Sequence, residues 1–249
     1  MTIVDGHVHV GLTKYVAVEV LLAQMQVAGI DRALLVQYGG CYDNAYLASC
    51  RQRYPGRFAA LGAVDYRAAD APARIRTEIQ THGLAGMRIS AAIEREEVWE
   101  AIGALGAMAS LTGGMEAITS PEMAARIQRF PEATFRIEHM GWFPDVQGTP
   151  DDPLYSRLME YAHFPNVVFT LSGFYAFGKR YPYQEIEPFV QRALECFSAS
   201  RLMWGSDFPP VTRHETCEMT LALPRAWDFV SAEDLTWILG GTALHWLEF

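Results

Sequence analysis

The sequence opens with a strand-like stretch, Ile3-Val4-Asp5-Gly6-His7-Val8-His9. Successive side chains of a strand point to opposite faces, so His7 and His9 lie on the same face, which we expect to point into the interior of a barrel. Two imidazoles placed this way can bind one ion, because imidazole nitrogen suits zinc, iron and manganese. An H-x-H pair alone is a weak signal, so the hypothesis of a site here depends on the rest of the chain.

Further strand-like runs alternate with segments of helical patterning along the whole chain. The predicted strands are Thr2 to Val10, Arg32 to Tyr38, Phe58 to Val64, Leu84 to Ile89, Ala109 to Ile118, Thr134 to His139, Val167 to Ser172 and Arg201 to Asp207. The predicted helices are Val16 to Ala28, Asn44 to Arg53, Ala71 to His82, Glu94 to Ala107, Pro121 to Phe130, Pro153 to Ala162, Glu185 to Ser198 and a stretch near Ala232 to Leu239. Eight such units of about 31 residues predict an α/β fold, a (β/α)8 TIM barrel.

Length and composition favour one domain over residues 1–249. Half of the residues are hydrophobic and 20% are charged, which allows a large core. The net charge of −9, without a run of Lys or Arg, argues against nucleic acid or an anionic membrane as the partner. No C-x-x-C pair occurs among Cys41, Cys50, Cys196 and Cys217, and the N-terminus lacks a signal-peptide pattern. We therefore expect reduced thiols and a cytoplasmic protein.

Residues that can act as ligands stand at the ends of two further predicted strands. His139 ends the sixth strand, and Asp207 ends the eighth. All strands of a parallel barrel end at the same mouth, so we expect both residues to meet His7 and His9 there as a metal site. Asp207 is the candidate catalytic base, because a carboxylate after an apolar strand needs a partner and can accept a proton from water. Its alternative role is an N-cap.

Six motifs, spread over almost the whole chain, carry a resemblance to a known family. They are Asp5-Gly6-His7-Val8-His9, Gly86-Met87-Arg88-Ile89, Glu138-His139-Met140-Gly141-Trp142, Asn166-Val167-Val168-Phe169-Thr170-Leu171-Ser172-Gly173, Arg201-Leu202-Met203-Trp204-Gly205-Ser206-Asp207-Phe208-Pro209 and Gly241-Thr242-Ala243-Leu244. Together they make the chain resemble the amidohydrolase-related (amidohydrolase 2) barrels. Within that family it looks most like the lactonase-like group, which includes 2-pyrone-4,6-dicarboxylate and sugar-lactone hydrolases.

The resemblance implies a role for each matching residue. His7 and His9 would bind a metal or the substrate. His139 would orient the substrate or act as a ligand, and Asp207 would activate water. Arg88 would hold a substrate carboxylate, which its forked guanidinium suits, or else form an exposed salt bridge. The implied cofactor is one divalent metal, zinc or alternatively manganese, although some lactonase-like relatives work without a metal.

Two positions depart from the family pattern. The region Leu111 to Ala117, at the end of the fifth predicted strand, has no histidine where many metal-dependent relatives have a ligand. Glu116 could take that place, since carboxylate oxygen binds metals, but glutamates at strand ends are usually solvated. Thr170 stands where the lactonase-like pattern often has lysine. Because this ligand is missing, a site that works without a metal is an alternative.

Several residues that follow strands are candidates for substrate binding. Tyr38 and Trp142 would wall a pocket for a planar or ring-shaped substrate, or else pack in the core. Ser172, before Gly173 in its motif, and His214, in the eighth βα loop, are further candidates. The aromatic segment Phe174 to Tyr183 would form a lid or a subunit contact, which leaves a homo-oligomer open.

These observations together predict a hydrolase that acts on a small carboxylated lactone or related ester. Water attacks the carbonyl, and Asp207 takes the proton. His7 and His9, with or without a divalent metal, polarise the electrophile, and His139 assists. Two alternatives stay open: a metal-dependent decarboxylase of an aromatic or enoic acid, and a non-catalytic barrel that acts as a binding module.

Overall fold

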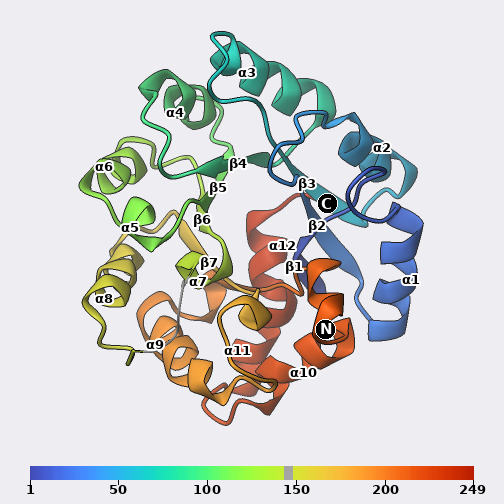
Figure 1. Ribbon diagram of the computed structural model, residues 1–249, viewed down its shortest axis with the longest axis vertical. Helices are drawn as coiled ribbons and strands as arrows, with labels where there is room; N and C mark the ends of the chain where they lie inside the picture. The colour runs from blue at the N-terminus through green and yellow to red at the C-terminus, as the bar shows by residue number, and fades with distance from the viewer. Residues whose placement is uncertain (143–147) are drawn as a thin grey trace.

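Eight parallel strands form one sheet in the order β1 to β8 (Figure 1). Their bounds are β1 Val4–Val8, β2 Arg32–Val36, β3 Phe58–Gly62, β4 Gly86–Ser90, β5 Met108–Thr112, β6 Phe135–Ile137, β7 Val167–Leu171 and β8 Leu202–Trp204. Val8 pairs in parallel with Phe208, just after β8, which brings the two outer strands together. The Asp207 N–H donates to the His7 carbonyl over 2.9 Å at the same seam. The predicted (β/α)8 TIM barrel is therefore confirmed.

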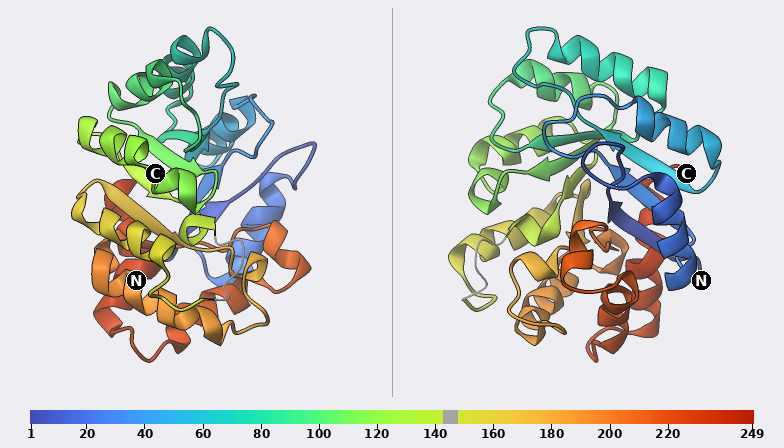
Figure 2. Two further views of the ribbon diagram at one scale, coloured as in Figure 1. Left: turned by 60° about the vertical axis from the view of Figure 1, so that its left-hand side comes forward. Right: turned by 45° about the vertical axis from the view of Figure 1, so that its right-hand side comes forward.

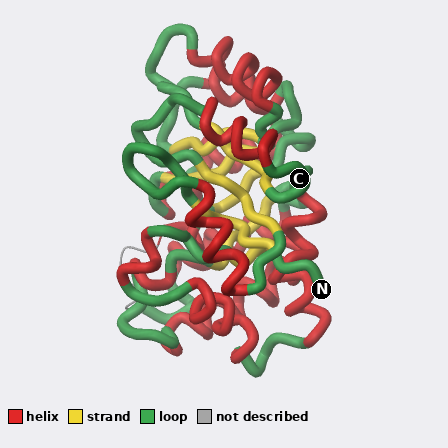
Figure 3. Tube along the Cα trace, turned by 90° about the vertical axis from the view of Figure 1, so that its right-hand side faces the viewer, coloured by secondary structure: helices red, strands yellow, loops and turns green. Residues whose placement is uncertain are grey.

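Helices surround the strands, which lie at the centre of the molecule (Figures 2 and 3). Their bounds are α1 Val18–Ala28, α2 Ala45–Arg53, α3 Ala71–His82, α4 Glu96–Gly103, α5 Met115–Ile118, α6 Pro121–Arg129, α7 His139–Trp142, α8 Pro153–Glu160, α9 Glu187–Phe197, α10 Cys217–Ala226, α11 Ala232–Thr236 and α12 Thr242–Trp246. This computed structural model describes residues 1–142 and 148–249, and nothing of the Trp142 side chain.

All eight predicted strands are present, but the predicted end of the fifth was wrong. β5 ends at Thr112, whereas the prediction extended it to Ile118. Gly113 and Gly114 follow with φ of +105° and +86°, which glycine adopts at no steric cost, and they turn the chain into α5. The sequence also failed to predict α10, because Pro224 lies inside it and proline normally ends a helix. Nor was α12 predicted.

Several predicted helix ends are confirmed. The Ser120 side chain accepts a hydrogen bond from the Met123 N–H and so caps α6. α1 and α3 each end in a left-handed glycine, Gly29 and Gly83. Across residues 1–142 and 148–249, no helix has the length and apolar character that crossing a bilayer requires.

A register shift in β1 aims the two histidines into the barrel. Asp5 pairs with Ala33, and Val8 pairs with Leu35, so three steps along β1 match two along β2. A bulge of this kind changes the face on which the following side chains lie. Val4 belongs to the apolar cluster inside the barrel, and strict alternation from Val4 would turn the two histidines outward.

The barrel interior is partly apolar and partly charged. Its apolar cluster is made of buried side chains from six strands and the C-terminal residues: Val4, Leu34, Val36, Ala59, Leu61, Met108, Val168, Met203, Ala243 and Leu247. Ser110, Arg136 and Glu138 are fully buried beside it. Buried charges are costly unless they are paired, so these residues must form hydrogen-bonded partnerships within the barrel.

Candidate active site

Four buried side chains meet at the barrel mouth. The Nε2 atoms of His7 and His9 lie 3.2 Å apart. Asp207 Oδ1 lies 3.3 Å from His9 Nε2 and 3.7 Å from His7 Nε2. The ring centroid of His139 is 4.5 Å from that of His7. The structure thus brings together the four residues that the sequence placed at one site.

The backbone is strained where two of these side chains leave their strands. His139 has φ of +46° and Asp207 has φ of +60°, a region that residues other than glycine rarely adopt. Such conformations destabilise by about 1–3 kcal/mol each and are concentrated at functional sites. Gly173 leaves the space that His139 needs, because a Cβ at Gly173 would lie 2.8 Å from His139 Nδ1. The local backbone therefore fixes where the two side chains point.

Asp207 is an ionised carboxylate, and one of its oxygens has no hydrogen-bond partner among the described residues. Burial alone would raise the pKa of Asp207, but nearby His139, His9 and the Tyr175 hydroxyl outweigh it and bring that pKa to about 2. The Tyr175 O–H donates to Asp207 Oδ2 over 2.6 Å. The other oxygen, Oδ1, is buried and has no hydrogen-bond partner among the described residues. A buried carboxylate oxygen in this state is poised to accept a proton or hydrogen bond from a ligand.

Two of the imidazoles are held neutral. Burial, together with the positive charge of Arg136, lowers the pKa of His7 well below its usual value. Burial also lowers the pKa of His139, although Asp207 opposes this effect. His139 Nδ1 lies 2.8 Å from the Ser172 hydroxyl. A neutral imidazole offers one N–H and one lone pair, so these rings can hydrogen-bond a substrate without carrying charge.

A buried ion network lies beside the four residues. Arg88 donates to Glu138 from Nε over 3.0 Å and from Nη2 over 2.7 Å, both to Oε2. The Ser110 O–H donates to Glu138 Oε1 over 2.7 Å, and Arg136 Nη1 lies 3.6 Å from the same oxygen. Burial raises the pKa of Glu138, but Arg88 and Arg136 lower it by more. The alternative role predicted for Arg88 was an exposed salt bridge, whereas its salt bridge with Glu138 is largely buried.

His7, His9 and Asp207 have the spacing of a metal site. In a tetrahedral zinc site with bonds of about 2.0–2.1 Å, neighbouring ligand atoms lie about 3.3 Å apart. The three distances here are 3.2, 3.3 and 3.7 Å. A second group with ligand spacing combines His7 with Glu138 and His139. The protein therefore holds a histidine and carboxylate cluster of the size that binds a divalent metal.

The hydrogen bonds of the cluster fit a metal only in part. His9 Nδ1 lies 2.7 Å from the Val36 carbonyl, so it donates there, and Nε2 is the nitrogen that faces the other cluster atoms. His7 differs, because its Nδ1 accepts a hydrogen bond from Arg136 and its proton must lie on Nε2. A ligand atom cannot carry a proton, so His7 does not fit as a metal ligand through Nε2. Glu116 is exposed on α5 and joins neither ligand group in the described residues.

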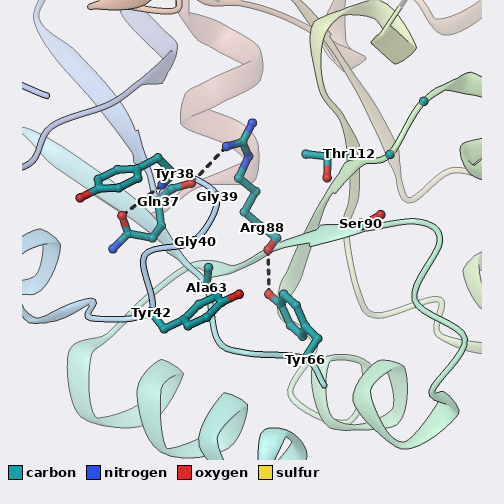
Figure 4. A pocket seen from close by; sticks show the side chains of 12 residues that line it. Gln37, Tyr38, Gly39, Gly40, Tyr42, Ala63, Tyr66, Arg88, Ser90 and Thr112 are labelled. Carbon is teal, nitrogen blue, oxygen red and sulfur yellow. Dashed lines mark hydrogen bonds between the residues drawn. The ribbon is translucent and has the colours of Figure 1, made fainter. Parts of the chain in front are cut away.

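A cavity of about 490 Å³ is lined in part by Arg88, the residue that Glu138 binds in the ion network. Tyr38, Tyr42 and Tyr66 line it, and the Tyr66 O–H donates to the Arg88 carbonyl over 2.7 Å (Figure 4). Ser90 and residues 112–114 close its other side. The cavity is therefore an aromatic space with a guanidinium at one border.

The remaining sequence candidates lie around this mouth. Ser172 is buried against His139. The exposed His214 ring stacks on Tyr175, with centroids 4.8 Å apart, and Tyr175 in turn reaches Asp207. The Trp142 side chain lies outside the described residues. In the segment Phe174 to Tyr183, Phe174, Phe177 and Tyr183 are buried, so much of the segment packs into the protein.

Three residues near the cluster have structural roles that sequence analysis missed. Arg136 hydrogen-bonds His7, Glu138 neutralises Arg88, and the Tyr15 ring stacks on His9 with centroids 5.1 Å apart. Arg136 and Glu138 carried a usable signal, because alternation places Arg136 in β6 and Glu138 directly after it on the same face, next to buried apolar residues. Tyr15 lies in a loop, where no periodicity reveals which way a side chain points.

The chain resembles proteins of known sequence and structure over most of its length. It is 29% identical over 201 residues to an L-fucono-1,5-lactonase from Burkholderia ambifaria, which covers 77% of this chain and 68% of the relative. A Pseudomonas putida protein assigned as a 2-pyrone-4,6-dicarboxylic acid hydrolase superimposes with a TM-score of 0.82 and 22% identity, covering 98% of this chain and 97% of that one. A zinc-bound amidohydrolase from Burkholderia multivorans superimposes with a TM-score of 0.79 and 21% identity, covering 98% of each chain.

The two structural likenesses show the fold alone, because their sequence identities are low. The family is shown by a sequence comparison of wider span. Residues 5–249, which include all four clustered side chains, match the sequence model described as Amidohydrolase. The chain belongs to the amidohydrolase family.

Proposed function

We propose that this protein hydrolyses a small lactone that carries a carboxylate. The observation that carries the proposal is the open oxygen of Asp207, buried between His7 and His9 with no partner among the described residues. The names of two relatives support the substrate class, because L-fucono-1,5-lactone and 2-pyrone-4,6-dicarboxylate are both lactones.

The site supplies the groups that lactone hydrolysis needs. Asp207 Oδ1 accepts a proton from water as the water oxygen bonds to the lactone carbonyl carbon. The His7 Nε2–H donates to the carbonyl oxygen as negative charge develops there. The ring C–O bond then breaks, the proton passes to the leaving ring oxygen, and an open hydroxy acid results. A single positioned donor of this kind contributes about 10²–10³-fold in kcat.

These steps use no metal. His9 and Asp207 keep the open lone pairs that zinc or manganese would need, but His7 presents an N–H to the same space. Decarboxylation, the alternative that firm metal occupancy would favour, therefore has less support from the residues themselves.

Arg88 is the proposed anchor for the substrate carboxylate. Its guanidinium borders the aromatic cavity, and three of its five N–H groups are taken by Glu138 and the Gln37 carbonyl. The remaining donors on Nη1 and Nη2 can bind an incoming carboxylate. Because Glu138 already neutralises much of the charge of Arg88, the anchor acts through hydrogen-bond geometry more than through charge.

The test is hydrolysis of two lactones that differ in charge. We expect turnover of 2-pyrone-4,6-dicarboxylate, followed by loss of the pyrone absorbance, and slower turnover of neutral L-fucono-1,5-lactone. Arg88→Lys keeps the charge and loses the fork, so KM for the dicarboxylate should rise about tenfold while KM for the neutral lactone stays within about twofold. Arg76→Lys, on the exposed face of α3, is the control and should change neither value. A folded protein that hydrolyses neither lactone, with or without added zinc, would overturn the proposal.

A further inference from the structure

Arg136 is a fully buried arginine that contacts one member of the cluster, His7. Its Nη2 donates to the Gly6 carbonyl over 2.7 Å and contacts His7 Nδ1 at 3.0 Å, and its Nη1 donates to the Ser110 hydroxyl over 2.6 Å. A guanidinium has five donors and no acceptor. His7 Nδ1 must therefore accept, and the single ring proton of His7 must lie on Nε2.

His9 has the opposite arrangement. Its Nδ1 lies 2.7 Å from the Val36 carbonyl, which can only accept, so Nδ1 carries a proton, and in the neutral ring Nε2 carries the lone pair. The two Nε2 atoms lie 3.2 Å apart, and the His7 N–H faces the His9 lone pair. The result is a chain of hydrogen bonds with one direction, from Arg136 through His7 and His9 to Val36.

This direction conflicts with a metal held by both histidines. Both Nε2 atoms would need a lone pair, so the His7 proton would have to move to Nδ1, where it would face a donor of Arg136. Metal-binding histidines normally donate their second ring N–H to a carboxylate, a carbonyl or water, as His9 does to Val36. Burial lowers the pKa of Arg136 to about 10, which still leaves the guanidinium charged at neutral pH.

We propose that Arg136 is a positioning residue that fixes His7 as an Nε2–H donor, and that His7 is not a ligand for a divalent metal in this protein. The two histidines at the mouth then act together in hydrogen bonding. The His7 Nε2–H donates to His9 Nε2 until a ligand oxygen takes the place of that acceptor. This inference concerns the protein alone and holds whichever reaction the site performs.

The direct test is the protonation of the histidine rings in the wild-type protein. The protein is labelled with ¹⁵N-histidine, treated with chelator, and examined by long-range ¹H–¹⁵N correlation NMR at neutral pH, with His7→Gln and His9→Gln used for assignment. We expect His7 as the Nε2–H form and His9 as the Nδ1–H form. A His7 ring protonated on Nδ1 overturns the proposal, whether or not the enzyme is active on any lactone.

Zinc titration against a competing chelator gives a second, independent readout. His7→Gln should change the zinc affinity of the protein by less than about tenfold, because His7 is not a ligand, and undetectable zinc binding by both proteins agrees with this. Tight binding of one zinc ion that His7→Gln weakens by more than about tenfold contradicts it.

Variants of Arg136 test the cause. Arg136→Gln supplies an oxygen that can accept from His7 Nδ1, so zinc affinity should rise about 10- to 100-fold. Arg136→Lys keeps a donor at this position and should show no such gain. A folded Arg136→Gln protein without the gain, or an equal gain in Arg136→Lys, contradicts the role of Arg136. If removal of this buried charge prevents folding, the NMR result and the His7→Gln titration decide the question.

Discussion

Glu138 holds two buried arginines together, and its removal should show how much the ion network stabilises the barrel. In Glu138→Gln the carboxylate becomes a neutral amide, which leaves Arg88 and Arg136 without their shared anion. The Glu138 side chain is fully buried, and Arg88 Nη2 lies 2.7 Å from it. Breaking a buried pair destabilises by about 3–5 kcal/mol. At about 2–4 °C per kcal/mol for a chain of this size, Tm should fall by about 6–20 °C.

The matched control is Glu100→Gln, which breaks a pair with Arg129 in which both side chains are about half exposed. Exposed pairs contribute about 0–1 kcal/mol, so Tm should fall by less than about 4 °C. Thermal unfolding followed by circular dichroism measures both variants. Equal, small shifts would refute the reasoning that the network stabilises the fold.

The stabilisation that Glu138 provides should depend on pH. The pKa of Glu138 is lowered in the folded protein, mainly because Arg88 and Arg136 outweigh its burial. The stabilisation from its charge is fully present above the unfolded pKa of about 4.5 and is lost as pH falls toward the folded pKa. The difference in Tm between wild type and Glu138→Gln should therefore be largest near neutral pH and shrink in acid. A difference that grows in acid contradicts this.

Two further variants probe the site directly. Gly173→Ala and Gly29→Ala both force a left-handed φ on alanine, so each should lower the free energy of unfolding by about 1–2 kcal/mol. Only Gly173→Ala should also lower kcat, by about tenfold or more, because its Cβ would press on His139. Equal kcat values in the two variants would contradict this role of the contact. Tyr175→Phe removes a hydrogen-bond donor to ionised Asp207, so the pKa of Asp207 should rise by about 1–2. The acid limb of the pH–rate profile should therefore shift to higher pH. An acid limb at the same pH as in wild type would show that it reports the titration of another group.

The sequence was sufficient to predict the barrel and the meeting of its four mouth residues. Alternation within strands and the common direction of parallel strands are local and topological rules, and both can be read from residues such as His139 and Asp207. The bulge between Asp5 and Val8 could not be predicted, because it depends on how β1 and β2 pair. Alternation gave the correct common face for His7 and His9, and the bulge decides that this face looks inward.

The hydrogen-bond partners of the site were not predictable in the same way. Arg88 showed no sign in the sequence that Glu138, 50 residues away, would bind it. The direction of the bond between Arg136 and His7 depends on atoms that lie 3.0 Å apart but 129 positions apart in the chain. Such contacts determine protonation and metal fit, so the family resemblance could suggest a metal but could not show whether these residues accept one.

The central claim is that Asp207 accepts the proton of the attacking water, and the substitution Asp207→Asn tests it most directly. Asparagine has nearly the same shape and cannot act as this base, so kcat/KM for the lactone should fall by about 10²–10⁴-fold. The circular dichroism spectrum should stay that of wild type, which shows that the barrel is intact. A folded Asp207→Asn protein with kcat/KM within about threefold of wild type would contradict the account.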